Sequence, residues 1–340
     1  MSDNRDAKIA YAVAPDQIMV LDLTTGTLEE LTTITWSGNE WQPFINLAWS
    51  PSGDRLALGT ESEVVVINKD KSNRTVISTD ETLLGKMVSW LDDDATVVYS
   101  VCEKVVGTTI GTDNSVVSTT DLYTVAPTRD NVCWEDTYVR GDYLSMLDFE
   151  ANMTSGGYHR PVVIHLPTGE LRELVSRDGD GCNINPSPEG NGTVIFTEEN
   201  HIDPAKIVNW DGEVIDELAY MVEPVDNEGI QQLRWSNEVE YLAHMGSRDY
   251  QRHAWIRKMS DKSAVYFGSD LIRPNLWVAP ESAPVRQENR KSSIRHNLKS
   301  GDRAVYTLQG QRIMSGEKYG PGLYVTARNG HLKLEIMEIQ

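Results

Sequence analysis

The sequence predicts an all-β fold: a six-bladed β-propeller closed by N- and C-terminal strands, followed by a small C-terminal antiparallel β module. Three observations predict this fold. Strand–turn–strand segments recur along the chain, they recur with a period of 41 to 49 residues, and the first and last repeats are each incomplete. A period in this range is typical of propellers, in which every repeat forms one four-stranded sheet.

The clearest repeat occupies residues 45–78. Residues 45–59 contain two short apolar strands joined by a Ser-Pro-Ser-Gly turn, and two further β-branched segments follow at 63–68 and 74–78. β-branched residues favour strands, whereas clusters of Gly, Pro, Asp, Asn and Ser mark the turns between them. These four segments predict one antiparallel sheet of the size of a blade.

Both halves of this repeat recur. Taking Trp49, Trp90, Thr137, Pro186 and Trp235 as equivalent positions of the opening strand gives steps of 41, 47, 49 and 49 residues. The outer pair of strands is expected in six hairpins, at residues 17–31, 63–78, 122–134, 161–175, 206–218 and 254–267. The chain therefore predicts six blades.

The two ends of the repeat region complete one blade. Trp277 follows Trp235 by 42 residues, where another opening strand is due, but no further repeat follows it. The strands expected at 7–12 and 17–22 have no opening strand before them. We expect the two fragments to share a sheet, because a closed ring leaves no blade incomplete and no sheet edge free for aggregation.

Composition divides the chain into a propeller at 1–283 and a linker with a small β module at 284–340. The tail contains ten Lys or Arg and five Asp or Glu, so it is basic, whereas the whole chain has a formal charge of -20. Strands are expected in the tail at 304–314, 320–330 and 332–337.

The acidic excess disfavours nucleic acid as a partner, and no apolar run predicts a membrane span.

Several turn and strand sequences resemble TolB-like propeller repeats. The run Trp-Ser-Pro-Ser-Gly-Asp-Arg-Leu-Ala at 49–57, Pro-Ser-Pro-Glu-Gly at 186–190 and Pro-Asn-Leu-Trp at 274–277 carry the resemblance, and the fourth blade, with Arg-Gly-Asp-Tyr at 140–143, departs from it. The resemblance implies the fold. Such repeats occur in translocation partners, peptidase gates, polysaccharide lyases and binding proteins, so it leaves the function open.

The tail resembles the C-terminal sorting domain of type IX secretion cargo. The resemblance lies in Leu-Gln-Gly-Gln-Arg at 308–312, Gly-Leu-Tyr-Val at 322–325, an Asn-Gly turn and a last apolar strand. It implies an extracellular or outer-membrane location, with the secretion machinery as a partner. Two features depart from the family: its first strands are short here, and residues 1–5 carry no secretory signal, which read literally indicates the cytoplasm. The alternative is an ordinary β-meander packed on the propeller.

Loop aromatic residues indicate a binding rim. In a propeller, the loops between blades and the loops between second and third strands share one face, and we expect this face to bind a glycan or a surface protein. Aromatic rings flanked by charged groups suit sugar rings. The expected ligand-binding residues are Trp36, Glu40, Trp41, Tyr158, His201, Arg248, Tyr250 and Arg252. By contrast, Trp49, Trp90, Trp235 and Trp277 recur on opening strands and are expected in the core.

Two other functions remain open. A lyase-like carbohydrate-active enzyme would use His201 and His159 with a divalent metal, and an interaction scaffold would dock a basic partner on the acidic disc. No cofactor is predicted. Asp178 and Asp180 alternate as in a calcium loop but lack the full acidic spacing, which favours a glycine-rich turn. A disulfide between Cys102 and Cys133 is disfavoured because the repeat places a strand between them.

Overall fold

The computed structural model contains strands and turns throughout its described part. It describes residues 5–13, 16–34, 45–60, 62–79, 87–101, 104–124, 133–150, 158–174, 181–198, 204–218, 231–248, 251–269, 271–280, 304–306, 312–313, 322–328 and 331–337. Among these residues, no helix has the length and apolar character required to cross a membrane.

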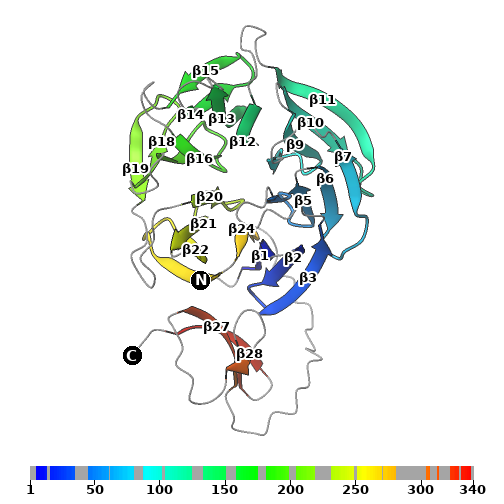
Figure 1. The fold of residues 1–340 in the computed structure, drawn as a ribbon, viewed down its shortest axis with the longest axis vertical. Helices are drawn as coiled ribbons and strands as arrows, with labels where there is room; N and C mark the ends of the chain where they lie inside the picture. Colours follow the sequence, from blue (N-terminus) through cyan, green and yellow to red (C-terminus); the bar gives the residue numbers. More distant parts are fainter. Residues whose placement is uncertain are drawn as a thin grey trace.

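Six four-stranded antiparallel sheets form a ring, as Figure 1 shows, and we number these blades from the one that contains the N-terminus. The strands of blades 1 to 3 are β24 (Ile272–Val278), β1 (Ala7–Val13), β2 (Gln17–Asp22) and β3 (Thr27–Thr33); β4 (Asn46–Trp49), β5 (Arg55–Gly59), β6 (Val64–Asn68) and β7 (Thr75–Ser78); β8 (Val88–Trp90), β9 (Thr96–Val101), β10 (Lys104–Ile110) and β11 (Val116–Thr124).

Blades 4 to 6 continue the ring in the order of the sequence. Their strands are β12 (Cys133–Arg140), β13 (Tyr143–Glu150), β14 (Tyr158–His165) and β15 (Glu170–Glu173); β16 (Gly181–Pro186), β17 (Val194–Glu198), β18 (Ala205–Val208) and β19 (Val214–Leu218); β20 (Gln231–Trp235), β21 (Tyr241–Arg248), β22 (Gln251–Lys258) and β23 (Ala264–Ser269). The predicted all-β, six-bladed propeller is confirmed.

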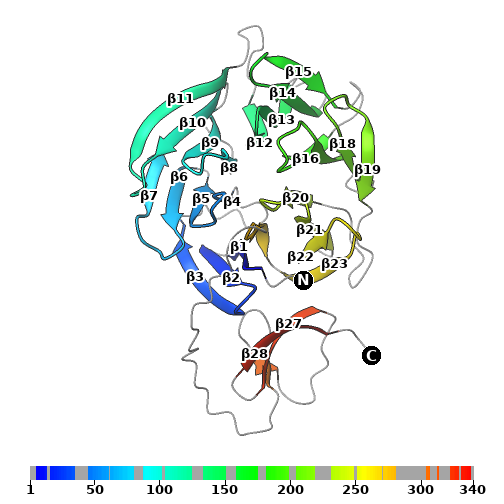
Figure 2. The ribbon, with the colours of Figure 1, turned by 180° about the vertical axis from the view of Figure 1, so that it is seen from behind.

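The two ends of the propeller share blade 1, as the incomplete repeats predict. Strand β24 pairs antiparallel with β1, with Lys8 opposite Trp277 and Ile9 opposite Leu276. Seen from either face, β24 lies beside β1 on the inner side of the ring (Figures 1 and 2). The contact closes the ring with ordinary backbone pairing, so blade 1 has the same four-stranded form as the other blades.

The hairpin expected at residues 122–134 is wrong. Strand β11 instead pairs with β10, with Val105 opposite Tyr123, and Cys133 begins the innermost strand of blade 4. The deciding feature is the turn before β11, where the Ser115 amide donates to Asp113 and Asn114 adopts a positive φ of 64°. Asp and Asn are the residues that tolerate such a turn, so the chain reverses there.

The recurrent tryptophans pack between blades, as expected. Trp49, Trp90, Trp235 and Trp277 are all at least nine-tenths buried. The Nε1 of Trp90 donates to the carbonyl of Ala48 at 2.9 Å, which lies one blade back. A large ring that also bonds the neighbouring backbone fixes the spacing of adjacent sheets.

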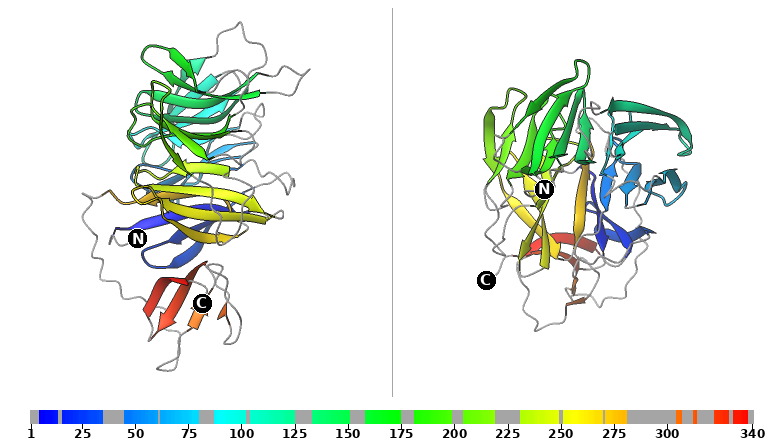
Figure 3. Two further views of the ribbon diagram at one scale, coloured as in Figure 1. Left: turned by 90° about the vertical axis from the view of Figure 1, so that its left-hand side faces the viewer. Right: turned by 45° about the horizontal axis from the view of Figure 1, so that its top comes forward.

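The tail forms a sheet of its own. Strands β25 (Ala304–Tyr306), β26 (Arg312–Ile313), β27 (Gly322–Arg328) and β28 (His331–Met337) pair antiparallel in the order β26-β25-β27-β28. The sheet lies outside the ring, with β27 beside β23 of blade 6 (Figure 3). The boundary expected at residue 283 falls between β24 and β25, in a part of the chain outside the described residues.

Ring closure predicts different outcomes for two truncations. A chain ending at Pro280 keeps β24, and we expect it to retain one cooperative thermal transition. A chain ending at Asp270 lacks β24 and therefore loses Leu276 and Val278 from the buried cluster around Ile9. Calorimetry of both chains measures the effect. Cooperative unfolding of the shorter chain at the same temperature would contradict closure by β24.

A matched pair of glycines tests the packing of Trp277. Gly53 and Gly169 have φ of 70° and 69°, but a Cβ on Gly53 would lie 2.4 Å from the Trp277 ring, whereas one on Gly169 would meet nothing within 4 Å. Gly169→Ala should cost about 1 kcal/mol of backbone strain. Gly53→Ala should cost roughly 2 kcal/mol more because it overpacks the blade interface. Equal losses of unfolding free energy in urea titrations would contradict this packing.

Candidate functional site

The rim residues were expected on the upper face, which we define by the loops between blades and between second and third strands. Tyr158 and His159 begin strand β14, Arg248 ends β21 and Arg252 lies in β22, so these four residues are on strands rather than in the expected loops. The remaining candidates lie outside the described residues, as does Cys102; they are Trp36, Glu40, Trp41, His201, Tyr250, Asp178 and Asp180. The rim stays a prediction.

The described side chains hold no group of three or more His, Cys, Asp or Glu residues that could bind a metal ion. His201, Asp178 and Asp180 lie outside the described residues. The structure therefore tests neither the lyase nor the calcium hypothesis.

The axial cavity is surrounded by the innermost strands of all six blades. Its volume is about 30 Å³, which is room for one or two water molecules. It is lined by Ala48 and Trp49 of β4, Val88 and Ser89 of β8, Tyr138 to Arg140 of β12, Asn185 and Pro186 of β16, Arg234 to Asn237 at the end of β20, and Asn275 and Leu276 of β24. Ser236 and Asn237 belong to the turn after β20, so the cavity opens on the lower face, which carries the turns between first and second strands.

Three blades are linked across the channel above this cavity. The guanidinium of Arg234, which is 2% exposed, donates from Nη1 to the carbonyl of Leu47 at 2.9 Å and lies 5.3 Å from the centre of the Tyr138 ring. The Nδ2 of Asn46 lies 3.4 Å from the Tyr138 hydroxyl, to which it donates. We call Arg234, Tyr138, Asn46 and Leu47 the channel bridge. It joins blades 2, 4 and 6, and two of its members, Arg234 and Tyr138, line the cavity.

The innermost strands are also held by side chains of the preceding blade. Each of three amides on these strands donates to a polar side chain across a blade interface. The pairs are Trp49 N to Asn275 Oδ1 at 3.1 Å, Val139 N to Ser89 Oγ at 3.3 Å, and Trp235 N to Asn185 Oδ1 at 2.9 Å. An innermost strand has no strand partner on its channel side, so these bonds satisfy amides that would otherwise be buried without an acceptor.

The cavity lining is cationic. Arg140 is the last residue of β12, and its Nη1 donates to the carbonyl of Trp90 at 3.0 Å. Burial lowers the pKa of Arg140, and the nearby carboxylate of Asp92 opposes that shift. Arg234 contributes a second guanidinium, and no Asp or Glu is among the residues that line the cavity. Both arginines remain charged at neutral pH because a guanidinium does not deprotonate in proteins.

One buried donor in the lining has no acceptor among the described residues. The Nε1 of Trp235 is buried without a hydrogen-bond partner, although the residue is 5% exposed. Its equivalents differ: the indole groups of Trp49 and Trp277 donate to the carbonyls of Asn275 and Pro51 at 3.2 and 2.9 Å. The indole Nε1 of Trp235 is therefore enclosed by the protein rather than exposed to the cavity.

Acidic turns surround the cavity mouth. Five turns join a first strand to a second strand, at residues 50–54, 91–95, 141–142, 187–193 and 236–240, and every one is described. Each carries at least one Asp or Glu, and none carries Lys or Arg. The mouth thus combines positive charge within the channel with negative charge around it.

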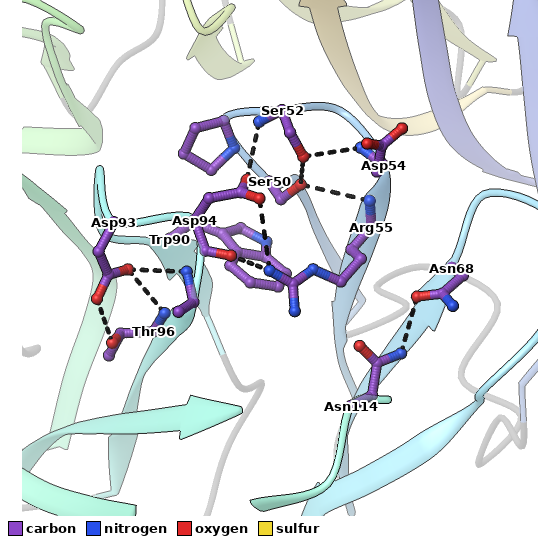
Figure 4. Close-up of polar contacts among 12 residues, drawn as sticks. Ser50, Ser52, Asp54, Arg55, Asn68, Trp90, Asp93, Asp94, Thr96 and Asn114 are labelled. Atoms are coloured by element: carbon purple, nitrogen blue, oxygen red, sulfur yellow. Dashed lines mark hydrogen bonds and ion pairs between the residues drawn. The ribbon is translucent and has the colours of Figure 1, made fainter. Parts of the chain in front are cut away.

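Hydrogen bonds hold these turns in place, as Figure 4 shows for blades 2 and 3. The amide of Ser52 donates to Asp94 Oδ1 at 2.8 Å, and the guanidinium of Arg55 donates to Asp94 and lies 5.0 Å from the centre of the Trp90 ring. Burial would raise the pKa of Asp93, but hydrogen bonds from Thr96 and Ala95 outweigh it and lower that pKa. The turns of adjacent blades are therefore rigidly connected.

A lysine occupies the equivalent place between blades 1 and 2. The Nζ of Lys8 lies 4.4 Å from the centre of the Trp49 ring and 4.5 Å from that of Trp277, and it donates to the carbonyl of Gly53. Burial lowers the pKa of Lys8 to about 8, with a smaller contribution from the charge of Lys69. The cation–π contacts hold the ammonium group at the interface that closes the ring.

Comparison with solved structures identifies the fold. No protein-family model matches the sequence, and no curated protein matches it. TolB from Acinetobacter baumannii is similar with a TM-score of 0.57 and 12% identity, over 79% of this chain and 66% of that one. A TolB-type protein from Agrobacterium tumefaciens has a TM-score of 0.54 and 11% identity, over 81% of this chain and 98% of that one. A chain from a nidogen–laminin complex has a TM-score of 0.53 and 10% identity, also over 81% of this chain and 98% of that one.

The chain has a TolB-like six-bladed propeller fold. The TM-scores lie above 0.5 at 10 to 12% identity, so the similarity is one of architecture. It agrees with the resemblance of the turn sequences, and it leaves the sorting-domain resemblance of the tail untested.

The depressed pKa of Lys8 predicts a pH-dependent contribution to stability. Between pH 8 and 10.5, Lys8 is largely neutral in the folded chain and protonated in the unfolded chain. The unfolded state then binds more protons, so stability rises with pH in this window, by at most about 1.4 kcal/mol per pH unit. The variant Lys8→Met keeps the aliphatic stem but cannot titrate. In urea titrations, the free energy of unfolding of the wild type should rise relative to that of Lys8→Met as the pH rises. A difference in unfolding free energy that does not change with pH would contradict the lowered pKa of Lys8.

Proposed function

We propose that this protein is a binding propeller that docks a protein partner on its lower face, at the mouth of the central channel. The observation that carries the proposal is the ring of five acidic turns around the mouth of the axial cavity. Small-molecule and peptide sites are typically concave and lie where several elements converge. The similarity to a chain of a nidogen–laminin complex supports an interaction role, since that chain is part of a protein complex.

The lower face is organised for binding with little rearrangement. Asp94 connects the turns of blades 2 and 3, and an ion pair between Arg5 and Glu238 with an N–O distance of 2.5 Å connects the N-terminus to blade 6. Turns that are already ordered lose little conformational entropy when a partner binds. Their carboxylates would speed the approach of a basic partner and make the association sensitive to salt.

The proposal places this docking at the cell surface. The resemblance of residues 308–325 to a sorting domain supports export with the tail as the signal read by the secretion machinery. Glycan binding on the upper rim and lyase chemistry at His201 stay predictions from the sequence, because Trp36, Trp41 and His201, which they depend on, lie outside the described part of the chain.

Matched charge variants test the docking face. The lower-face variant carries Asp54→Asn, Asp142→Asn and Glu189→Gln, all exposed turn residues, and the control carries Glu29→Gln, Glu30→Gln and Glu217→Gln on outer strands. The immobilised proteins are exposed to a surface-protein extract of the source cells, and captured proteins are quantified by mass spectrometry at low and high salt.

A partner should be retained by the wild type and the control, and lost from the lower-face variant. Added salt should reduce its capture by the wild type, because screening weakens attraction between exposed charges. Equal capture by both variants would contradict docking on the lower face.

A further inference from the structure

The outer strand of blade 3 has a long, exposed sheet edge. Strand β11 is nine residues long, and its first six residues are all exposed. It ends its sheet on the outside of the ring (Figure 1), and no strand in the described part of the chain pairs with its outer side. Val116 and Val117 are 48% and 67% exposed, and Val117 is the more exposed of the two. A free edge of this kind is a template for pairing with another strand.

The outer strands of the other five blades are protected in ways that β11 is not. Strands β7 and β15 have four residues each, and β23 lies beside β27 of the tail. Strand β3 carries Glu29 and Glu30, and β19 carries Asp216 and Glu217. Short strands, charged residues and covering elements are the usual means of blocking strand addition. By contrast, β11 contains no Pro, Gly or Lys, and its single charged residue is Asp121.

The sequence of β11 favours an extended partner strand at its centre. Five of its nine residues are Val or Thr, which are β-branched and favour sheets. Its register against β10 shifts at Val117 and at Leu122, and residues 118–121 between these bulges pair regularly. Because bulges bend and twist a strand, we expect the regular part of any new pairing to be centred on these four residues.

The edge is electrically neutral, although the chain has a formal charge of -20. The carboxylate of Asp121 accepts the ammonium group of Lys104 at 2.6 Å, and these two residues are the only charged ones on β10 and β11. Acidic surfaces of two copies repel each other, and like charges placed together cost free energy. A neutral edge therefore allows two acidic copies to meet, whereas it offers a strongly charged partner no complementary charge.

We propose that two copies of the chain associate through β11, with the two strands antiparallel and the two blades joined into one continuous sheet. Identical antiparallel strands are related by a two-fold axis, which is the commonest symmetry of homodimers. With the axis at Thr120, Val117 lies opposite Tyr123 and Thr119 opposite Asp121 across the two chains. The carboxylates then do not face each other, and a β-branched side chain meets an aromatic one, which is a favourable cross-strand pair.

Two matched lysine variants test the proposal by sedimentation over a range of concentrations. Val117→Lys places a charge on the β11 edge, and Val214→Lys makes the same change at a 51% exposed valine of β19. Wild type and Val214→Lys should dimerise equally, whereas Val117→Lys should weaken self-association at least about tenfold, because an edge lysine opposes strand pairing. Circular dichroism checks that both variants fold. The edge is neutral, so added salt should not dissociate the dimer.

Hydrogen exchange locates the interface. In the wild type, peptides covering residues 116–124 should lose protection on dilution, whereas those covering β7 should not change. A wild type that stays monomeric up to about 100 μM, or equal effects of the two lysine variants, would overturn the proposal. Protection of residues 116–124 that appears only with the surface-protein extract would assign the edge to another protein and overturn it as well. The lower-face charge variant should dimerise like the wild type, so this test is independent of the proposed function.

Discussion

The structure depends on satisfying the free backbone edges of its sheets. A propeller removes one such edge by closing the ring, and here β24 pairs antiparallel with β1. The innermost strands still present a second edge to the channel, where buried amides and carbonyls would cost free energy without partners. Side chains of adjacent blades meet this requirement, and Arg234 reaches the carbonyl of Leu47 across the axis.

The same requirement makes the channel capable of recognition. A channel filled only with apolar side chains would leave the edge amides unpaired, so Asn, Ser, Tyr and Arg side chains line it beside the apolar ones. Arg140 and Arg234 then give it positive charge, while the turns outside are acidic because Asp and Glu side chains accept hydrogen bonds from turn amides. Stability and binding thus use the same residues, and substitutions in the channel are expected to affect both.

The ring could be predicted from the sequence because its signals are local and periodic. The recurrence of Trp49, Trp90 and Trp235 indicated the blades, and Trp277 located the closing strand. The outer hairpin of blade 3 was not predicted from the sequence. Its two strands are joined by a short Asp-Asn turn at 113–114, and no longer turn motif marks the end of residues 104–110. The channel bridge could not be predicted, since Asn46, Tyr138 and Arg234 are separated by about a hundred residues and meet only when six blades close. The one available signal was Arg140, which ends an opening strand that in blades 2, 3 and 6 ends in Trp.

Native-state hydrogen exchange measured by mass spectrometry tests the closed ring most directly. The account predicts that the amides of β24 and β1 exchange only through global unfolding, with the same free energy as those of the central strands β5 and β9. Peptides covering residues 272–278 that exchange as rapidly as the exposed turns, while β5 and β9 remain protected, would contradict it. The ring would then be open at blade 1, and the channel would lack the enclosure on which the docking site depends.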